Sequence, residues 1–176
     1  KGWDVVVLDN ESEGSHPEII DSSFTYHKID VSKPEVIQLM IDENPEYVIH
    51  AAAISDVDYS IRESHTTMVS NVMGNINIFE ACKSISNLKK FIYVSTDEVY
   101  GECEHKKNES EILFPKNPYA CSKAVGSIMR YAYDNSCIEL RDKTAETRFC
   151  NVFGPRQDKR KIFPAIKESL EGNYSI

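Results

Sequence analysis

Short apolar segments alternate along the chain with longer segments in which apolar residues recur at helical spacing. The segments predicted to be buried strands lie at residues 5–8, 47–53, 91–95 and 147–153, and residues 24–29 form a weaker strand candidate with an alternating pattern. The segments predicted to be helices lie at residues 34–44, 64–84, 118–135 and 164–170. Because parallel strands need crossover helices, this alternation predicts an α/β fold with a doubly wound, Rossmann-like parallel sheet covered on both faces.

Ligands of such sheets bind beyond the carboxyl ends of the strands, so the residues there are the first candidates for a site. Asp9 ends the first apolar segment. An acidic residue at this point of a dinucleotide-binding fold accepts hydrogen bonds from the adenosine ribose, although a solvated turn aspartate would look the same. Asp30 and Val31 close the second segment, where they could frame an adenine ring.

A hydroxyl and two carboxyls, Thr96, Asp97 and Glu98, follow the fourth apolar segment. Carboxylates at the mouth of a buried strand lose hydration, and this favours a functional role. The alternative is a helix start, with Thr96 as the cap and the acids in the first turn. Because residues 99–101, Val-Tyr-Gly, are expected to end the segment before a helix develops, the functional interpretation is preferred.

Tyr119 and Lys123 stand four residues apart at the start of a predicted helix. Residues at this spacing share one helical face, so the ammonium is expected near the phenol. A nearby cation favours the phenolate and lowers the pKa of tyrosine from about 10. Tyr119 is therefore predicted to act as a base near neutral pH.

Composition narrows the class of protein. The chain has 176 residues and a net charge of −8, which argues against a nucleic-acid partner. Its apolar segments fall short of the ~20 residues of a membrane span. The five cysteines form no Cys-x-x-Cys pair and stand at no zinc-ligand spacing, so we expect reduced thiols, no metal site and a cytoplasmic location.

These residues, in this order, resemble the extended short-chain dehydrogenase/reductase family, in particular its NAD-dependent nucleotide-sugar epimerases and dehydratases. The similar motifs lie at residues 7–10, 30–31, 50–53, 57–61, 70–74, 94–101, 119–123 and 148–157. Within the family, Ser-Thr-Asp-Glu-Val-Tyr-Gly at residues 95–101 is most similar to the dTDP-glucose 4,6-dehydratases. The 4-epimerases usually carry small residues in place of Asp97 and Glu98.

The resemblance implies a mechanism. Tyr119 would remove the proton from the sugar 4-hydroxyl while hydride leaves C4 for NAD, and Thr96 would hydrogen-bond that oxygen. Lys123 would hold the cofactor ribose. Glu98 would then remove the C5 proton, and Asp97 in its protonated form would donate to the departing 6-hydroxyl.

The resemblance also implies binding roles. The expected NAD-binding residues are Asp9, Asn10, Asp30, Val31, Ala51, Ala52, Ala53, Asn71, Tyr119 and Lys123, and the expected substrate-binding residues are Thr96, Asn151 and Arg156. An acidic Asp9 favours NAD over NADP, since it would repel a 2′-phosphate. A nucleotide sugar is the implied substrate, and the helices at residues 64–84 and 118–135 would pair with a second subunit as a homodimer.

Two features depart from the family pattern. The sequence around Asn151 is more similar to epimerases and decarboxylases than to dehydratases, so a 4-epimerase or a decarboxylase is the alternative. The seven glycines lie at positions 2, 14, 74, 101, 126, 154 and 172, and no two are within ten residues of each other. They cannot form the family's glycine-rich phosphate loop.

We therefore expect residues 1–176 to form a single incomplete NAD-binding domain. It would lack the first strand, the glycine-rich loop and most of the carboxyl-terminal substrate part, which would start at residues 156–176. A non-catalytic fragment of such an enzyme is the second alternative.

Overall fold

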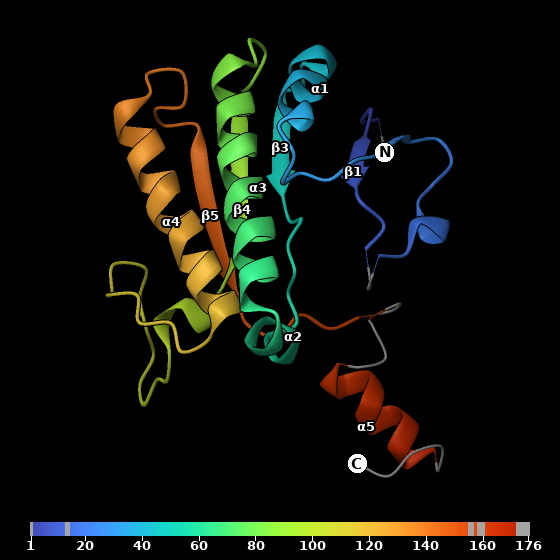
Figure 1. Ribbon diagram of the computed structural model, residues 1–176, viewed down its shortest axis with the longest axis vertical. Helices are drawn as coiled ribbons and strands as arrows, with labels where there is room; N and C mark the ends of the chain where they lie inside the picture. Colours follow the sequence, from blue (N-terminus) through green and yellow to red (C-terminus); the bar gives the residue numbers. More distant parts are fainter. Residues whose placement is uncertain (1, 13–14, 155–156, 158–160, 172–176) are drawn as a thin grey trace.

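The computed structural model describes residues 2–12, 15–154, 157 and 161–171. Parallel strands alternate with helices along these ranges (Figure 1). The strands are β1 (Val6–Asp9), β2 (Thr25–Lys28), β3 (Tyr47–His50), β4 (Lys90–Thr96) and β5 (Thr144–Phe149). The helices are α1 (Glu35–Glu43), α2 (Val57–Arg62), α3 (Ser64–Ser84), α4 (Pro118–Ser136) and α5 (Ile162–Leu170), with short 3₁₀ helices η1 (Pro17–Ile19) and η2 (Asp97–Tyr100).

The strands form two parallel groups, β1–β2 and β3–β4–β5, instead of one continuous sheet. In the Rossmann strand order 3-2-1-4-5-6, the first strand lies between the second and the fourth. That place corresponds to the interval between β1 and β3, where the described residues form no strand. An edge-on ring contact between Trp3 and Tyr47, with centroids 5.3 Å apart, joins the two groups.

The helices α1, α3 and α4 lie over one face of the β3–β5 group (Figure 1). The core lies between them, where the fully buried Phe79 of α3 packs edge-on against Phe91 of β4 and stacks on Tyr133 of α4. On the opposite face, which the sequence pattern predicted to be covered, Ile49 is 68% exposed and Phe149 is 49% exposed. The parallel α/β architecture is confirmed, with one face covered by described helices.

Several predicted boundaries were wrong. The third strand ends at His50, and Ala51–Ala53 belong to a loop. The fifth strand begins at Thr144 instead of residue 147, because its inward positions carry polar residues that the apolar pattern does not register. The helix α2 was not predicted, although Asp56 caps it by accepting a hydrogen bond from the Tyr59 N–H at 2.8 Å.

At Gly126 the backbone of α4 lies directly against side chains of β4 and α3. A Cβ at this position would lie 2.2 Å from the Tyr93 hydroxyl and 2.7 Å from the Asn75 amide nitrogen. Tyr93 is fully buried, so its ring has little space to move. We expect Gly126→Ala to lower the free energy of unfolding by about 1–3 kcal/mol, because overpacking outweighs the gain in helix propensity.

Denaturant unfolding measures that change. Gly154→Ala is the matched control, since a Cβ at Gly154 meets no atom within 4 Å. Equal stability of the two variants would contradict the packing argument.

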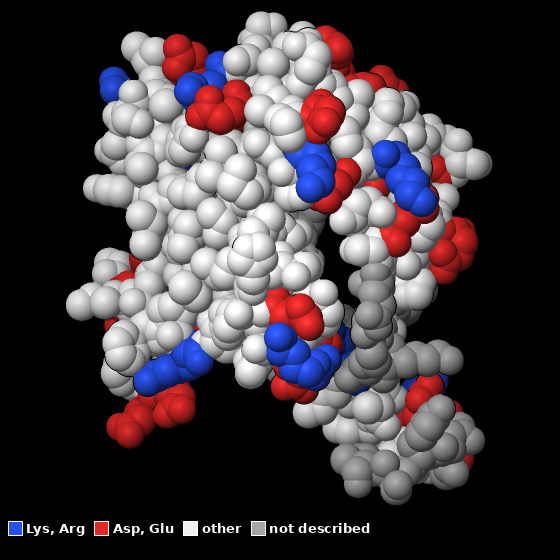
Figure 2. Space-filling model, in the orientation of Figure 1, with Lys and Arg blue, Asp and Glu red and all other residues white. Residues whose placement is uncertain are grey.

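The surface over α3 and α4 is largely uncharged, and Lys, Arg, Asp and Glu gather toward the ends of these helices (Figure 2). Exposed apolar side chains on them include Val69, Met73, Ile128 and Tyr131. Within the described ranges, we find no helix with the length and apolar character needed to cross a membrane.

Candidate active site

Thr96, Asp97, Glu98, Tyr119 and Lys123 come together where β4 ends and α4 begins. Thr96 is the last residue of β4, and its Oγ1 accepts a hydrogen bond from the Glu98 N–H at 3.3 Å. The capping interpretation of this segment is thus confirmed, and residues 97–100 form the 3₁₀ helix η2 that the sequence had argued against. The cap turns the chain sharply, so that both carboxyls follow the strand end directly.

The start of α4 is fixed by a second cap. Asn117 Oδ1 accepts a hydrogen bond from the Ala120 N–H at 2.7 Å, and Pro118 occupies the first turn. The same side chain donates from Nδ2 to Glu98 Oε2 at 2.9 Å. Asn117 therefore holds η2 against α4, and sequence reasoning missed it although an Asn-Pro pair is a helix-start signal.

The two carboxyls have different surroundings. Asp97 is exposed, and one of its oxygens accepts a hydrogen bond from Thr96 Oγ1 at 3.3 Å. Glu98 is half-buried and bound by Asn117. Neighbouring carboxyls in unlike environments are suited to separate acid and base roles.

Tyr119 is 9% exposed, and its pKa moves in the direction opposite to the expected one. Burial raises the pKa of Tyr119, the negative charge of Glu98 raises it further, and a hydrogen bond with Thr96 lowers it in part. Lys123 was expected to lower the pKa of Tyr119. It does not do so in this structure, because the lysine side chain turns away from the phenol and toward the sheet.

The ammonium of Lys123 donates to the Val94 carbonyl oxygen at 2.8 Å and lies 5.1 Å from the centre of the Tyr93 ring. The side chain is 4% exposed, and burial lowers the pKa of Lys123 to about 8, while the charge of Glu146 opposes that shift. The same ammonium, together with complete burial, lowers the pKa of His50 to about 3, burial being the larger cause. Near neutral pH, His50 is uncharged beside a charged Lys123.

Ser60 of α2 belongs to the site and was missed with its helix. Its Oγ accepts a hydrogen bond from the Tyr119 N–H at 3.2 Å and donates to the Val57 carbonyl at 2.7 Å. The side chain is fully buried. Ser60 therefore fixes the first turn of α4 and, with it, the position of Tyr119 relative to the sheet.

Asn71 of α3 uses its amide to hold the loop after β3. It accepts from the Ile54 N–H at 2.8 Å, and it donates to the Ile54 carbonyl at 3.0 Å and to Ser122 Oγ at 2.9 Å. These partners account for its buried amide, so the structure gives Asn71 a positioning contact with the loop that contains Ala51, Ala52 and Ala53. That loop lies at the carboxyl end of β3.

The expected adenosine-side residues lie at the ends of β1 and β2. Asp9 Oδ1 accepts from the Glu11 N–H at 2.7 Å, and Asp30 Oδ1 accepts from the Ser32 N–H at 2.9 Å. The second oxygen of Asp9 can accept from a ribose hydroxyl, and the second oxygen of Asp30 can accept from the amino group of an adenine ring. These donors and acceptors fit the adenosine half of NAD, whereas the phosphate cradle has no counterpart among the seven glycines of the chain.

The other expected residues are dispersed. Asn10 is exposed and its side chain accepts from the Ser12 N–H at 3.0 Å. The Val31 carbonyl accepts from Asn77 Nδ2 at 2.9 Å. Asn151 is exposed after β5, and Arg156 lies outside the described residues. In the described ranges, no three His, Cys, Asp or Glu side chains are grouped closely enough to hold a metal ion.

A cavity of about 780 Å³ opens on the β5 side of η2. Its walls include Asp97 and Glu98 of η2, Arg130 of α4, and Glu146 and Arg148 of β5. Its volume is in the range of small-molecule sites, about 300–1,000 Å³. Arg130, Glu146 and Arg148 were not predicted as site residues, and Glu146 lies before the predicted start of this strand at residue 147.

Comparison with known proteins agrees with this geometry. The family model described as "NAD dependent epimerase/dehydratase family" matches residues 1–176. The dTDP-D-glucose 4,6-dehydratase of Dictyostelium discoideum is 34% identical over 164 residues, which are 86% of this chain and 37% of that protein.

Solved structures of both enzyme types share the fold. A dTDP-glucose 4,6-dehydratase from Streptomyces venezuelae, with NAD and TYD bound, has a TM-score of 0.81 at 28% identity over 96% of this chain and 53% of that chain. The UDP-glucose 4-epimerase of Thermotoga maritima, with UDP-glucose, has a TM-score of 0.79 at 29% identity over 91% of this chain and 52% of that chain.

The chain thus spans about half the length of these solved structures and a smaller share of the curated relative. The family resemblance inferred from the sequence motifs is confirmed. The predicted Rossmann-like fold class is confirmed as well. Since the family model covers every residue, the chain belongs to the NAD dependent epimerase/dehydratase family.

Proposed function

We propose that this chain carries the catalytic centre of a nucleotide-sugar 4,6-dehydratase of the dTDP-glucose type. The observation that carries the proposal is the pair of unlike carboxyls, Asp97 and Glu98, beside Tyr119 and Thr96. A 4-epimerase returns hydride to C4 and has no step for a second acid and base. The dehydratase reaction needs both.

In the proposed reaction, Tyr119 takes the proton of the sugar 4-hydroxyl, and Thr96, its hydrogen-bond partner, orients that oxygen. The resulting 4-ketone makes the C5 proton acidic, and Glu98 removes it while held by Asn117. Asp97 gives a proton to the departing 6-hydroxyl, and water is lost across C5–C6. General acid–base groups of this kind typically contribute about 10²–10⁴-fold each to the rate.

NAD, when bound, supplies the hydride acceptor for C4 and the donor for C6. The residues proposed to hold it are Asp9 and Asn10 at the ribose, Asp30 and Val31 at the adenine, and Lys123 at the second ribose. The loop of Ala51–Ala53, fixed by Asn71, is the proposed path across the sheet. Thr96, Asn151 and Arg156 are proposed to contact the nucleotide sugar.

Product analysis tests the proposal. The complete gene product that contains these residues is incubated with dTDP-glucose or UDP-glucose, and the products are separated and identified by NMR. A 4-keto-6-deoxy sugar supports the dehydratase. A galactose or pentose nucleotide without keto sugar would replace it by an epimerase or decarboxylase, and no turnover of either substrate would favour a non-catalytic role.

Residues 1–176 alone are expected to bind NAD weakly. The pyrophosphate of a dinucleotide is normally held by backbone N–H groups of a glycine-rich turn at a helix N-terminus, and the chain has no such turn. Isothermal titration calorimetry with NAD measures the affinity. Binding with a Kd of about 1 μM or tighter, roughly −8 kcal/mol, would contradict the argument.

A homodimer stays a prediction, and so does a cytoplasmic location. The uncharged surface over α3 and α4 (Figure 2), with exposed Val69, Met73, Ile128 and Tyr131, supports pairing of these helices with a second copy. Sedimentation velocity of the complete gene product would distinguish a monomer from this dimer. We likewise propose that residues 1–176 form one domain and that residues 156–176 begin the substrate-binding region.

A further inference from the structure

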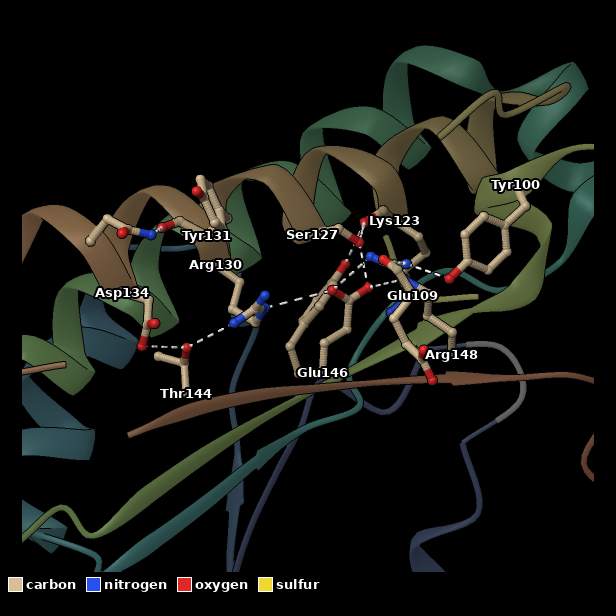
Figure 3. Close-up of polar contacts among 12 residues, drawn as sticks. Tyr100, Glu109, Lys123, Ser127, Arg130, Tyr131, Asp134, Thr144, Glu146 and Arg148 are labelled. Carbon is tan, nitrogen blue, oxygen red and sulfur yellow. Dashed lines mark hydrogen bonds and ion pairs between the residues drawn. The ribbon is translucent and has the colours of Figure 1, made fainter. Parts of the chain in front are cut away.

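One buried carboxylate lies outside the catalytic groups named above. Glu146 is on β5, and only 7% of its side chain is exposed. Its neighbours on the same face of the strand are Thr144 and Arg148, since alternate residues of a strand share a face. This face points toward α4 (Figure 3).

Glu146 is bound from three directions. Arg148 forms a two-pronged contact, Nε to Oε1 at 2.8 Å and Nη2 to Oε2 at 3.2 Å. Ser127 of α4 donates from Oγ to Oε1 at 2.5 Å, and Arg130 of α4 lies 3.6 Å from Oε2. A buried carboxylate held by this many donors has a fixed position and costs stability if one partner is removed.

The contacts of Arg148 lead from Glu146 to η2. Its Nη1 donates to the hydroxyl of Tyr100 and to the Glu109 carbonyl oxygen, and the guanidinium lies 5.0 Å from the centre of the Tyr100 ring. Tyr100 is the last residue of η2, the turn that carries Asp97 and Glu98. The orientation of the two carboxyls is therefore tied at one end to Thr96 and at the other to Arg148.

The contacts of Ser127 lead from Glu146 to Lys123. Ser127 Oγ lies 3.2 Å from the Lys123 carbonyl oxygen, one helical turn earlier in α4. The Lys123 ammonium lies over the ring of Tyr93 of β4, and its charge interacts with those of His50 of β3 and Glu146 of β5. Of these three, Glu146 supplies the negative charge.

We propose that Glu146 is a positioning residue of the active site, which fixes η2 through Arg148 and Tyr100 and supplies the buried countercharge of Lys123. The proposal rests on the proposed function for its kinetic consequence. Its electrostatic consequence does not depend on which reaction is catalysed. The charge of Glu146 opposes the effect of burial on the pKa of Lys123, so removal of that charge lowers this pKa.

The test compares Glu146→Gln with wild type in the complete gene product. We expect kcat to fall by about 10-fold to 10²-fold with KM within about threefold, since small displacements of catalytic groups cost rates of this order. The alkaline limb of the kcat–pH profile should move to lower pH by about one unit, because Lys123 loses its proton earlier. An unchanged kcat with an unshifted alkaline limb would overturn the proposal.

Three further variants make the result specific. Glu139→Gln, the same change at an exposed glutamate, should leave kcat and the pH profile as in wild type. Glu146→Asp keeps the charge and shortens the side chain, so kcat should fall while the alkaline limb stays in place. If Glu146→Gln does not fold, Tyr100→Phe removes only the hydroxyl that Arg148 binds, and a wild-type kcat in that variant would overturn the link to η2.

Failure of the proposed function can be told apart from failure of this inference. If the wild type forms neither keto sugar nor epimer, the pKa of Lys123 is followed instead by NMR of lysine-labelled protein, with Lys123→Arg to assign the signal. A lower Lys123 pKa in Glu146→Gln than in wild type and Glu139→Gln supports the countercharge. Equal pKa values in all three proteins would overturn it.

Discussion

Replacement of Tyr119 by Phe is expected to lower kcat by about 10²–10⁴-fold, with KM changed by less than about threefold. The substitution removes one hydroxyl from a ring that is 9% exposed and leaves the ring in place. The missing hydroxyl is the proposed acceptor of the 4-hydroxyl proton, so oxidation at C4 loses its base while the substrate contacts persist. Steady-state kinetics on the complete gene product measure both constants.

Tyr131→Phe is the matched control, since Tyr131 lies on the same helix and is 66% exposed. It should retain wild-type kinetics. Unfolding in denaturant should give similar midpoints for both variants, because the Tyr119 backbone N–H, which Ser60 binds, is unchanged. A Tyr119→Phe protein with more than about a tenth of the wild-type kcat would refute the assignment of the base.

Much of the covered half of the fold is predictable because its strands and helices bury apolar side chains at regular spacing. The helices α3 and α4 begin and end within a residue or two of their predicted limits. The strand β5 is different, because its inward positions carry Glu146 and Arg148, which satisfy each other in an ion pair. An apolar pattern cannot register a strand whose buried face is charged, and the same error concealed the network around Glu146.

The sequence was sufficient to predict that Thr96, Glu98 and Tyr119 lie close together. Thr96 and Glu98 stand at the end of a strand, and Tyr119 stands in the first turn of the helix beside it. Side-chain direction was not predictable from spacing. The i, i+4 relation of Tyr119 and Lys123 predicted a lowered tyrosine pKa, whereas the ammonium binds the Val94 carbonyl. That carbonyl belongs to β4, and the packing of α4 against this strand is a property of the tertiary fold.

Glu98→Gln is the second substitution with a large expected effect. It is isosteric, and the amide oxygen can still accept the hydrogen bond from Asn117. The amide cannot take the C5 proton, so formation of the keto sugar should fall by about 10²–10⁴-fold. Glu104→Gln, an exposed change nearby in the chain, should leave the rate unchanged.

The same substitution has a second, independent consequence at Tyr119. Burial is the larger cause of the raised pKa of Tyr119, and the charge of Glu98 adds to it. Removal of that charge makes the phenolate less costly, so the pKa of Tyr119 should fall toward its ordinary value. Ultraviolet difference titration, with Tyr119→Phe as the reference, measures this shift without any turnover, and an unshifted titration would contradict the electrostatic contact.

Together the two consequences distinguish the candidate reactions by the sign of the change in rate. A larger phenolate fraction near neutral pH favours oxidation at C4, which dehydratases and epimerases share. If the protein is a 4-epimerase, Glu98→Gln should therefore keep or raise kcat. If it is a 4,6-dehydratase, the same variant should oxidise C4 and then stop, because no base remains to remove the C5 proton. Release of the keto sugar should then fall, although the pKa of Tyr119 is lowered in the same variant.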